Sequence, residues 1–333
     1  SPDWVLGMHY TSWDRSDRAK PVLLAEDGPE QLGVFSEHSA EVDGHFWRTE
    51  VSDLGASATL ADGSIYRLAG RLGRDAHGDM IASHLRENGV RCLLEPDAAA
   101  TSVATARLDP TGAASYEFEL DWTLPPAAAL ARDFDDAAGG PLHHMHAGSI
   151  ATMLAPGDAE VMALLERISA VTTISYDPNV RPTIVPDRAF ARARAEESVR
   201  LADVVHASDE DIAWLYPDRP LRESLQAWQQ MGPAFVVMTR GAEDIVAVTA
   251  HGVVERPIVP VDVADTVGAG DSFTAALLAA LDDRSLLGAA NRGRLHAMDP
   301  ADVESVLIYA SRASAITASR PGADPPTRAE LAD

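Results

Sequence analysis

The segment of the chain best suited to chemistry is the string DTVGAGDSF at residues 265–273, which an Ala/Leu-rich run follows directly. Gly268 and Gly270 allow a sharp backbone bend and leave amide groups uncovered. The first amides of a helix lack internal partners and its dipole makes that end slightly positive, so the loop favours an anion. The carboxylate of Asp271 would repel a phosphate bound there, so its presence indicates another task. Accepting the proton of an attacking hydroxyl is such a task. The segment therefore indicates a phosphoryl-transfer centre.

Three other interpretations of this string are open. A dinucleotide-binding loop needs a third glycine near position 273, where the chain has Phe273. A hydrolase with Ser272 as nucleophile usually carries its Gly-Asp-Ser near the N-terminus, whereas this string comes late in the chain. The third interpretation is an ordinary helix start without a functional role. An isolated Gly-x-Gly would be equally consistent with it. The full string of nine residues favours phosphoryl transfer.

A second polar string, SYDPNVRP at residues 175–182, ends an apolar run. Asp177, Asn179 and Arg181 alternate with other residues, so an extended backbone would point all three to one side. Asn and Arg side chains donate to phosphate oxygens, and Arg181 can hold a phosphate with two hydrogen bonds. The alternative is a turn bounded by prolines, in which the polar residues are incidental.

A third string, FVVMTRG at residues 235–241, is an apolar run that ends in Thr239 and Gly241. These two residues either line a nucleotide or simply close the strand. Three histidines form a further cluster at 143, 144 and 146. His144 and His146 would share one side of a strand with no carboxylate nearby, which favours packing or substrate contact over a metal site.

The elements that would position these strings alternate between strands and helices from about residue 64 onward. We expect a doubly wound α/β fold, with a mostly parallel sheet flanked by helices, whose strand ends carry the strings. A turn signal at residues 109–112 predicts a hairpin over 101–120 that serves as a small β lid. The expected strands are 4–7, 22–25, 65–69, 103–108, 115–120, 171–176, 204–207, 235–239, 245–249 and 253–257. The expected helices are 78–88, 156–168, 187–202, 209–216, 221–230, 269–281 and 300–318. We expect an Ala/Asp-rich linker at 127–140 and an irregular tail at 319–328.

Composition excludes several classes of protein. The 333 residues include 51 acidic and 27 basic ones, a formal net charge of −24, which argues against nucleic-acid and anionic-membrane partners. Lys20 is the only lysine, so a Walker-type Gly-Lys-Ser/Thr loop is absent. Cys92 is the only cysteine, which excludes an intramolecular disulfide. We see no signal peptide and no membrane-spanning run, so we expect a cytoplasmic protein.

In their order and spacing, the three strings resemble the ribokinase-like (PfkB-type) carbohydrate kinases, whose signature is Asp-Thr-x-Gly-Ala-Gly-Asp. The similarity runs from about residue 64 to 328 and is strongest to bacterial fructokinase-like sugar kinases. It includes GRDAHGD at 73–79, LHHMHAGS at 142–149 and ASDED at 207–211. The resemblance implies one ribokinase-like kinase domain over 1–333, with lid strands from 1–50 and 101–120 that often mediate a homodimer. It also implies phosphorylation of a sugar hydroxyl with ATP and Mg²⁺.

The resemblance assigns roles to particular residues. Asp271 would be the general base, and the amides of Gly268, Ala269 and Gly270 would form the anion hole. The residues near the phosphates and the nucleotide would be Asn179, Arg181, Thr239, Gly241, Asp265 and Thr266. Asp211 would organise Mg²⁺ through water. Tyr116 and Phe118 share one face of the lid hairpin, where they either cover the sugar or pack within the hairpin.

The chain departs from the family pattern at its acceptor side. The family's Gly-Gly-x-x-x-Asn sugar signature is absent from residues 49–56, which are TEVSDLGA. His206 stands where many relatives have Lys, and Ser208 replaces an Asn. Two alternatives therefore stay open: a non-catalytic sugar- or nucleotide-sensing protein on a kinase fold, and a kinase of nucleosides or sugar acids.

Overall fold

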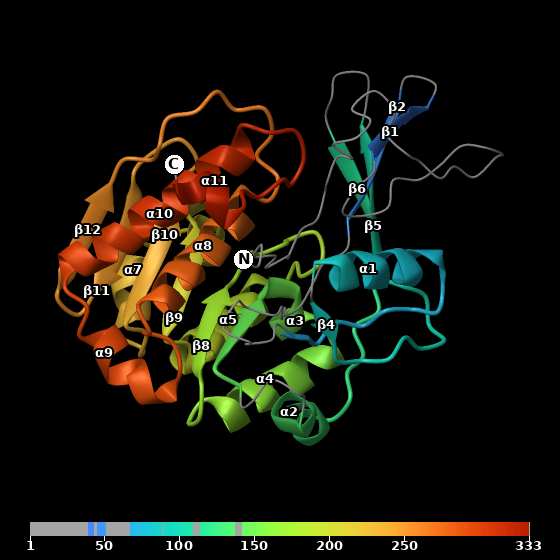
Figure 1. Ribbon diagram of the computed structural model, residues 1–333, viewed down its shortest axis with the longest axis horizontal. Coiled ribbons are helices and arrows are strands. Elements are labelled where there is room, and N and C mark those ends of the chain that lie inside the picture. The colour runs from blue at the N-terminus through green and yellow to red at the C-terminus, as the bar shows by residue number, and fades with distance from the viewer. Residues whose placement is uncertain are drawn as a thin grey trace. The chain divides into compact units, whose positions relative to one another are not determined.

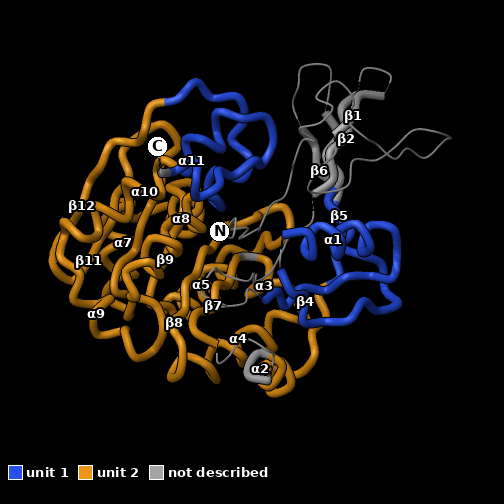
Figure 2. The backbone as a smooth tube through the Cα atoms, in the orientation of Figure 1, with its two compact units in different colours: residues 1–121, 261–272, 313–333 blue, residues 122–260, 273–312 orange. Residues whose placement is uncertain are grey.

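The computed structural model describes residues 39–42, 45–50, 67–88, 90–108, 114–136 and 142–332. Two compact units make up the chain (Figure 2). Unit 1 consists of Ser1–Asp121, Val261–Ser272 and Ala313–Asp333, and unit 2 of Trp122–Pro260 and Phe273–Arg312. The strands expected at 4–7 and 22–25 lie outside the described residues, as does the hairpin turn at 109–112.

A six-stranded sheet forms the centre of unit 2 (Figure 1). Its strands lie in the order β12-β11-β10-β9-β8-β7, and β7 to β10 are parallel while β11 and β12 are antiparallel to their neighbours. The expected mostly parallel sheet is confirmed. The strands are β7 (His144–Gly148), β8 (Thr173–Asp177), β9 (Val204–Ser208), β10 (Phe235–Thr239), β11 (Ile245–Thr249) and β12 (Gly252–Arg256).

Helices cover both faces of this sheet, as the burial of every residue of β8 requires. Helix α5 packs on β8 and α7 on β10, and Phe273 of α8 stacks on His206 of β9. The helices of unit 2 are α2 (Ala127–Asp136), α3 (Ser149–Met153), α4 (Gly157–Ile168), α5 (Arg188–Leu201), α6 (Asp209–Leu215), α7 (Leu221–Gln229) and α9 (Arg292–His296). Helices α8 (Ala269–Asp283) and α10 (Pro300–Ala318) have residues in both units.

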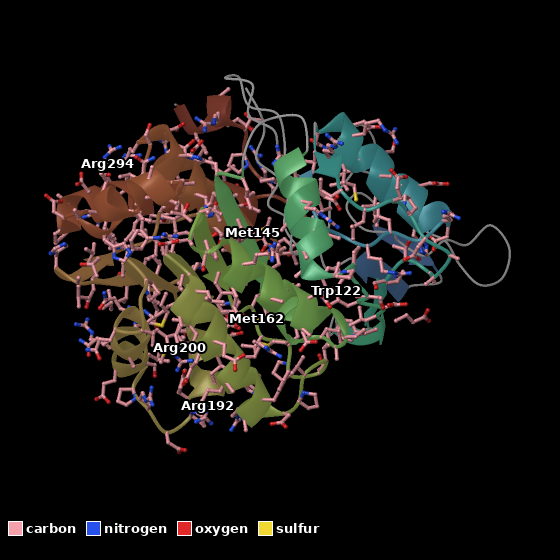
Figure 3. All side chains as sticks on the ribbon, turned by 90° about the horizontal axis from the view of Figure 1, so that it is seen from below. Trp122, Met145, Met162, Arg192, Arg200 and Arg294 are labelled. Atoms are coloured by element: carbon pink, nitrogen blue, oxygen red, sulfur yellow. The ribbon has the colours of Figure 1, made fainter. Side chains whose placement is uncertain are left out.

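Side chains fix the ends and the packing of these helices. Asp187 caps α5 by accepting hydrogen bonds from the amides of Ala189 and Phe190. In the interior of unit 2, Trp122, Met145 and Met162 are all buried (Figure 3). The Trp122 indole donates to the Ala151 carbonyl at 3.1 Å, so its one polar atom is satisfied.

The described residues of unit 1 form two smaller sheets. Strands β3 (Arg67–Leu68) and β4 (Arg91–Cys92) pair in parallel beside α1 (Ala76–Glu87). A four-stranded antiparallel sheet has the order β1-β2-β5-β6. Its strands are β1 (Ser39–Val42), β2 (His45–Glu50), β5 (Val103–Leu108) and β6 (Ala114–Glu119). These strands come from 1–50 and 101–120, the segments expected to form the lid. Its action as a lid, and the assignment of 1–333 to a single kinase domain, stay predictions.

Two segments differ from expectation. Residues Ala127–Asp136, expected to be a linker, form α2, which packs on α4 and whose first amide donates to Glu160 at 2.7 Å. Alanine is the strongest helix former, so tertiary contacts are enough to fix a helix there. The expected irregular tail agrees with the structure over 319–327, and the short helix α11 (Arg328–Ala332) begins at the last residue of that range. Among the described residues, no helix is both long and apolar enough to cross a lipid bilayer.

Candidate active site

The glycine-rich loop before α8 is built within unit 1. Gly268 has φ +74°, a left-handed conformation, and a Cβ there would lie 2.6 Å from the Cβ of Ala323. Asp265 holds the loop on both sides: one carboxylate oxygen accepts from the amide of Val267 and the other from that of Gly322. The loop therefore has a fixed path that only glycine fits at position 268.

Helix α8 begins at the end of this loop. Its first intrahelical hydrogen bond runs from the Ser272 amide to the Gly268 carbonyl at 2.8 Å. The amides of Gly270 and Asp271 thus lie in the first turn of the helix, before its regular hydrogen-bond ladder begins. The Ala269 amide donates to the Thr266 carbonyl, at 3.3 Å. Asp271 is half-buried in this first turn, so a carboxylate and the positive end of a helix dipole are adjacent along the chain.

The turn after β8 carries the predicted phosphate contacts, and two buried carboxylates hold its backbone. Asp177 accepts from the amide of Asn179 at 3.0 Å, and Asp211 accepts from that of Val180 at 2.7 Å. Asn179 has φ +33°, a conformation that Asn tolerates better than most residues. The Arg181 guanidinium donates back to the carbonyls of Asn179 and Val180.

The two carboxylates differ in their electrostatics. Burial would raise the pKa of Asp177, but the charge and the hydrogen bond of His206, together with His146 and the Asn179 amide, hold this pKa below its ordinary value. For Asp211, burial and then the charge of Asp177 raise the pKa, against hydrogen bonds from Ser208 and Val180 that lower it. Asp177 is therefore the member of the pair that stays ionised more readily.

His206 joins three of the segments that the sequence analysis identified. Its Nδ1 lies 2.8 Å from Oδ2 of Asp177 and 2.9 Å from the hydroxyl of Thr274 in α8. Its Nε2 lies 3.1 Å from the hydroxyl of Thr239 at the end of β10. The Phe273 ring stacks on the imidazole, with centroids 4.9 Å apart. The sequence analysis gave His206 and Thr274 no role in the site. Their positions in the sequence do not show which side chains they contact in the fold.

The predicted site residues fall into both units. Unit 1 holds those of the glycine loop, namely Asp265, Thr266, Gly268, Ala269, Gly270 and Asp271, together with Tyr116 and Phe118 of β6. Unit 2 holds Asn179, Arg181, Asp211, Thr239 and Gly241. Gly241 has φ +52° with open space where a Cβ would be, and Phe118 is half-buried. The side chain of Tyr116 lies outside the described residues.

The residues that the structure describes around Asp211 do not form a preassembled metal site. Asp211 accepts hydrogen bonds from the amide and the hydroxyl of Ser208 in a capping box, and from Val180, so both of its oxygens are engaged. Within the described ranges, no three His, Cys, Asp or Glu side chains are grouped so as to hold a metal ion. Mg²⁺ keeps several waters and binds chiefly to nucleotide phosphates, so these residues fit it only as a hydrated ion beside Asp211.

The two histidines of β7, His146 buried and His144 half-buried, belong to the sheet. His144 hydrogen-bonds to Thr173 and Ser175, and His146 to the same Ser175 hydroxyl at 2.8 Å. Burial first, then neighbouring histidines, lowers the pKa of His144 to about 3; burial, with a contribution from His206, lowers that of His146 to about 4. Both rings are neutral at pH 7, and their contacts account for their position without a metal.

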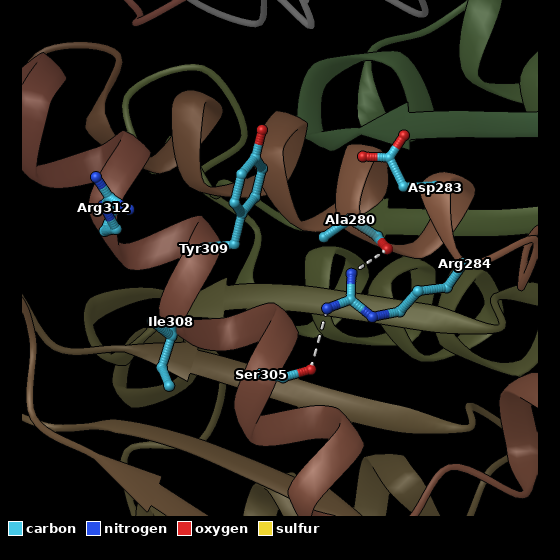
Figure 4. A pocket seen from close by; sticks show the side chains of 7 residues that line it. All are labelled: Ala280, Asp283, Arg284, Ser305, Ile308, Tyr309 and Arg312. Carbon is cyan, nitrogen blue, oxygen red and sulfur yellow. Dashed lines mark hydrogen bonds between the residues drawn. The ribbon is translucent and has the colours of Figure 1, made fainter. Parts of the chain in front are cut away.

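A surface pocket of about 270 Å³ lies within unit 2, between the C-terminal part of α8 and α10 (Figure 4). Arg284 closes one side by donating to the Ala280 carbonyl and the Ser305 hydroxyl. At a rise of about 1.5 Å per residue, Asp283 at its rim is roughly 18 Å along the helix from Asp271. This pocket is therefore separate from the predicted centre.

Known proteins resemble the chain over most of its length. A sequence profile for the pfkB family of carbohydrate kinases matches residues 62–330. A protein named fructokinase from Rhizobium leguminosarum bv. trifolii is 32% identical over 246 residues, 69% of this chain and 74% of that protein. All three strings fall within the residues that the profile matches.

Two solved structures extend this comparison. The fructokinase from Xylella fastidiosa with bound ATP has a TM-score of 0.65 at 25% identity, over 77% of this chain and 80% of its own. A fructokinase double mutant from Vibrio cholerae O395, bound to fructose, ADP and potassium ion, has a TM-score of 0.62, also at 25% identity and with the same coverage of both chains.

Proposed function

The chain belongs to the pfkB family of carbohydrate kinases, and we propose that it transfers the γ-phosphoryl group of ATP to a hydroxyl of fructose. Phosphorylation of a sugar hydroxyl follows from the family and from relatives named fructokinase. Fructose is the acceptor best supported, because a similar solved structure holds fructose and ADP. The expected ribokinase-like fold agrees with the structure neighbours.

One observation carries the proposed chemistry: the left-handed Gly268 turns the chain directly into a helix whose first turn contains Asp271. A carboxylate at that place can accept the proton of a sugar hydroxyl while the γ-phosphoryl group is transferred in line. General-base catalysis of this kind contributes about 10²–10⁴-fold to the rate.

The loop amides of Gly268, Ala269 and Gly270 form the proposed anion hole. Amides at the start of a helix are fixed donors, and fixed donors stabilise charge that develops during transfer without reorganising. Asp265 stabilises the path of the glycine loop, because its carboxylate accepts hydrogen bonds from the amides of Val267 and Gly322. The proposed contribution of Asp265 to nucleotide binding is therefore to shape the loop. Thr266 is exposed and would provide a hydroxyl at the edge of the loop.

The strand ends of unit 2 supply the remaining contacts to ATP in this proposal. Asn179 and Arg181 donate to the phosphates, and Thr239 and Gly241 lie beside the nucleotide. The support is geometric, since Asp177 and Asp211 hold the amides of Asn179 and Val180 in the turn that carries the first pair. Gly241 is open on its Cβ side, as close approach of a ligand to the backbone requires.

The divalent cation proposed is Mg²⁺, which neutralises charge on the β- and γ-phosphates when bound. Asp211 would hold one of its waters. Tyr116 and Phe118 as sugar-covering residues, a homodimer through the four-stranded sheet, and a cytoplasmic location also stay predictions.

A panel of acceptors tests the proposed function. Purified protein is incubated with ATP and Mg²⁺ and with fructose, other sugars, nucleosides or sugar acids, and ADP release is followed together with ligand-induced thermal shifts. Fructose should give the highest kcat/KM, and EDTA should abolish turnover. A nucleoside or sugar acid as the best acceptor would replace fructose, whereas stabilisation by sugars without ADP release would indicate a sensor instead of a kinase.

A further inference from the structure

The buried imidazole of His206 contacts three segments that the proposed function places around ATP. We propose that His206 is a positioning residue: by holding Asp177, it fixes the turn that carries Asn179 and Arg181. The inference rests on the proposed function, because it concerns how this kinase holds the phosphates. It assigns a task to a histidine that touches no reacting group in the proposed mechanism.

The protonation of the pair can be assigned from its chemistry. Asp177 is ionised, and an ionised carboxylate only accepts hydrogen bonds. The proton of the 2.8 Å contact therefore lies on Nδ1 of His206. Nε2 then accepts from the Thr239 hydroxyl when the ring is neutral and donates to it when the ring is protonated. The donor toward Asp177 is present in both states.

The carboxylate that His206 holds also shapes the phosphate turn. One oxygen of Asp177 binds the imidazole, and the other accepts from the amide of Asn179, whose φ is +33°. Without its donor, Asp177 would be a buried carboxylate that must rotate toward another partner or take up a proton. Either change weakens the hydrogen bond that holds Asn179 in its left-handed conformation.

The imidazole is itself held firmly, as a positioning group must be. It is buried, stacks on Phe273, and contacts Thr239 and Thr274. Thr274 lies three residues after Asp271 in α8, so the helix that presents the proposed base also contacts the ring that orders the phosphate turn. One ring thus links β8, β9, β10 and α8 within a few ångströms.

Three substitutions separate the contacts of His206. His206→Asn can place an amide donor near the position of Nδ1 and keep the contact with Asp177. His206→Gln can reach Thr239 in place of Nε2 but leaves Asp177 without its donor, and His206→Ala removes both contacts. His144→Gln is the matched control, because His144 is another imidazole on this sheet, half-buried, whose ring hydrogen-bonds only to Thr173 and Ser175.

The readouts are the KM values for ATP and fructose, kcat, the Kd of a non-hydrolysable ATP analogue, and the melting temperature. A hydrogen bond to a charged group corresponds to about 10- to 100-fold in affinity. We expect His206→Gln and His206→Ala to raise the Kd of the analogue and the KM for ATP by that factor. The KM for fructose should stay within about twofold, because His206 contacts none of the proposed acceptor residues. His206→Asn should restore analogue binding to within about threefold of wild type, and His144→Gln should lower only the melting temperature.

The outcomes separate this inference from the proposed function. Wild-type protein that binds the analogue but phosphorylates no acceptor overturns the proposed function, and the variant Kd values still test the role of His206. Folded His206→Gln that binds the analogue as tightly as wild type overturns the inference alone. So does His206→Asn that binds as weakly as His206→Ala, since the imidazole would then serve packing only. Wild-type protein that does not bind the analogue overturns both.

Discussion

Gly268 lies against Ala323 so closely that a Cβ on residue 268 would be 2.6 Å from the Cβ of Ala323. The glycine also has φ +74°, which costs an L-residue roughly 1–2 kcal/mol. Gly268→Ala therefore combines backbone strain with a steric overlap. We expect it to lower the free energy of unfolding by about 3 kcal/mol and to raise the KM for ATP at least tenfold, because small displacements of a binding loop are costly.

Gly241→Ala separates the two causes. Gly241 has φ +52°, but nothing lies within 4 Å of a Cβ built there. Urea denaturation should show a loss of only about 1 kcal/mol for this variant, the strain alone. Equal losses for the two alanine variants would contradict the close packing of Gly268 on Ala323.

Arg292 holds a buried carboxylate in unit 2. Its guanidinium donates to Asp203 at 2.6 Å and to the carbonyls of Ser169 and Thr172. Arg292 is about a third exposed but Asp203 is buried, so removing the guanidinium takes a charged hydrogen-bond donor from a buried carboxylate, at a cost of about 1–3 kcal/mol. Arg292→Ala should lose that much free energy of unfolding in urea denaturation.

The matched control for this change is Arg200→Ala. Arg200 pairs with Glu196 one helical turn away on the surface of α5. Exposed pairs with this spacing contribute about 0.3–0.5 kcal/mol. A loss for Arg292→Ala as small as that of the control would mean that Asp203 does not depend on Arg292.

Stability should fall with acid below pH 6.5 because of the histidines of β7. Burial lowers the pKa of His144 to about 3 in the folded protein, whereas a histidine in the unfolded chain titrates near 6.5. Between these pH values the unfolded chain binds the extra proton, so the contribution of neutral His144 is present above pH 6.5 and is lost as the pH falls. The slope is about 1.4 kcal/mol per pH unit for one such group.

His144→Gln should reduce the pH dependence of the free energy of unfolding by about that slope between pH 5 and 6. The change is measured by urea denaturation at each pH. His251→Gln is the control, because His251 is exposed and its ring contacts only a carbonyl. An unchanged slope for His144→Gln would show that the imidazole takes up a proton without unfolding.

The local pattern of the sequence predicts several elements to the residue, because each depends on neighbours along the chain. The expected 103–108, 235–239, 245–249 and 300–318 coincide with β5, β10, β11 and α10. Strand β7 is absent from the list of expected strands, because two of its five residues are histidines, and only the alternation of His144 and His146 indicated a strand there. It is buried only because Thr173 and Ser175 of the next strand satisfy those rings.

The candidate site likewise has one part that local sequence predicts and another that depends on contacts between distant residues. The glycine loop and Asp271 are adjacent in sequence, so their shared place at the start of α8 could be predicted. His206 and Thr274 are 68 residues apart, and no local pattern shows that they meet. Ser208 and Asp211 form a capping box at the start of α6. Sequence resemblance alone does not distinguish this capping role of Asp211 from a contact to a metal ion.

The central claim is that Asp271 accepts the proton of the sugar hydroxyl, and Asp271→Asn tests it most directly. The change keeps the size of the side chain and removes its basicity. The control is Asp283→Asn, at the other end of the same helix. In single-turnover assays with ATP, Mg²⁺ and fructose, phosphoryl transfer by Asp271→Asn should be slower by about 10²–10⁴-fold, with the Kd of an ATP analogue within threefold of wild type. Asp283→Asn should transfer at the wild-type rate. Transfer by Asp271→Asn at the wild-type rate would contradict the account.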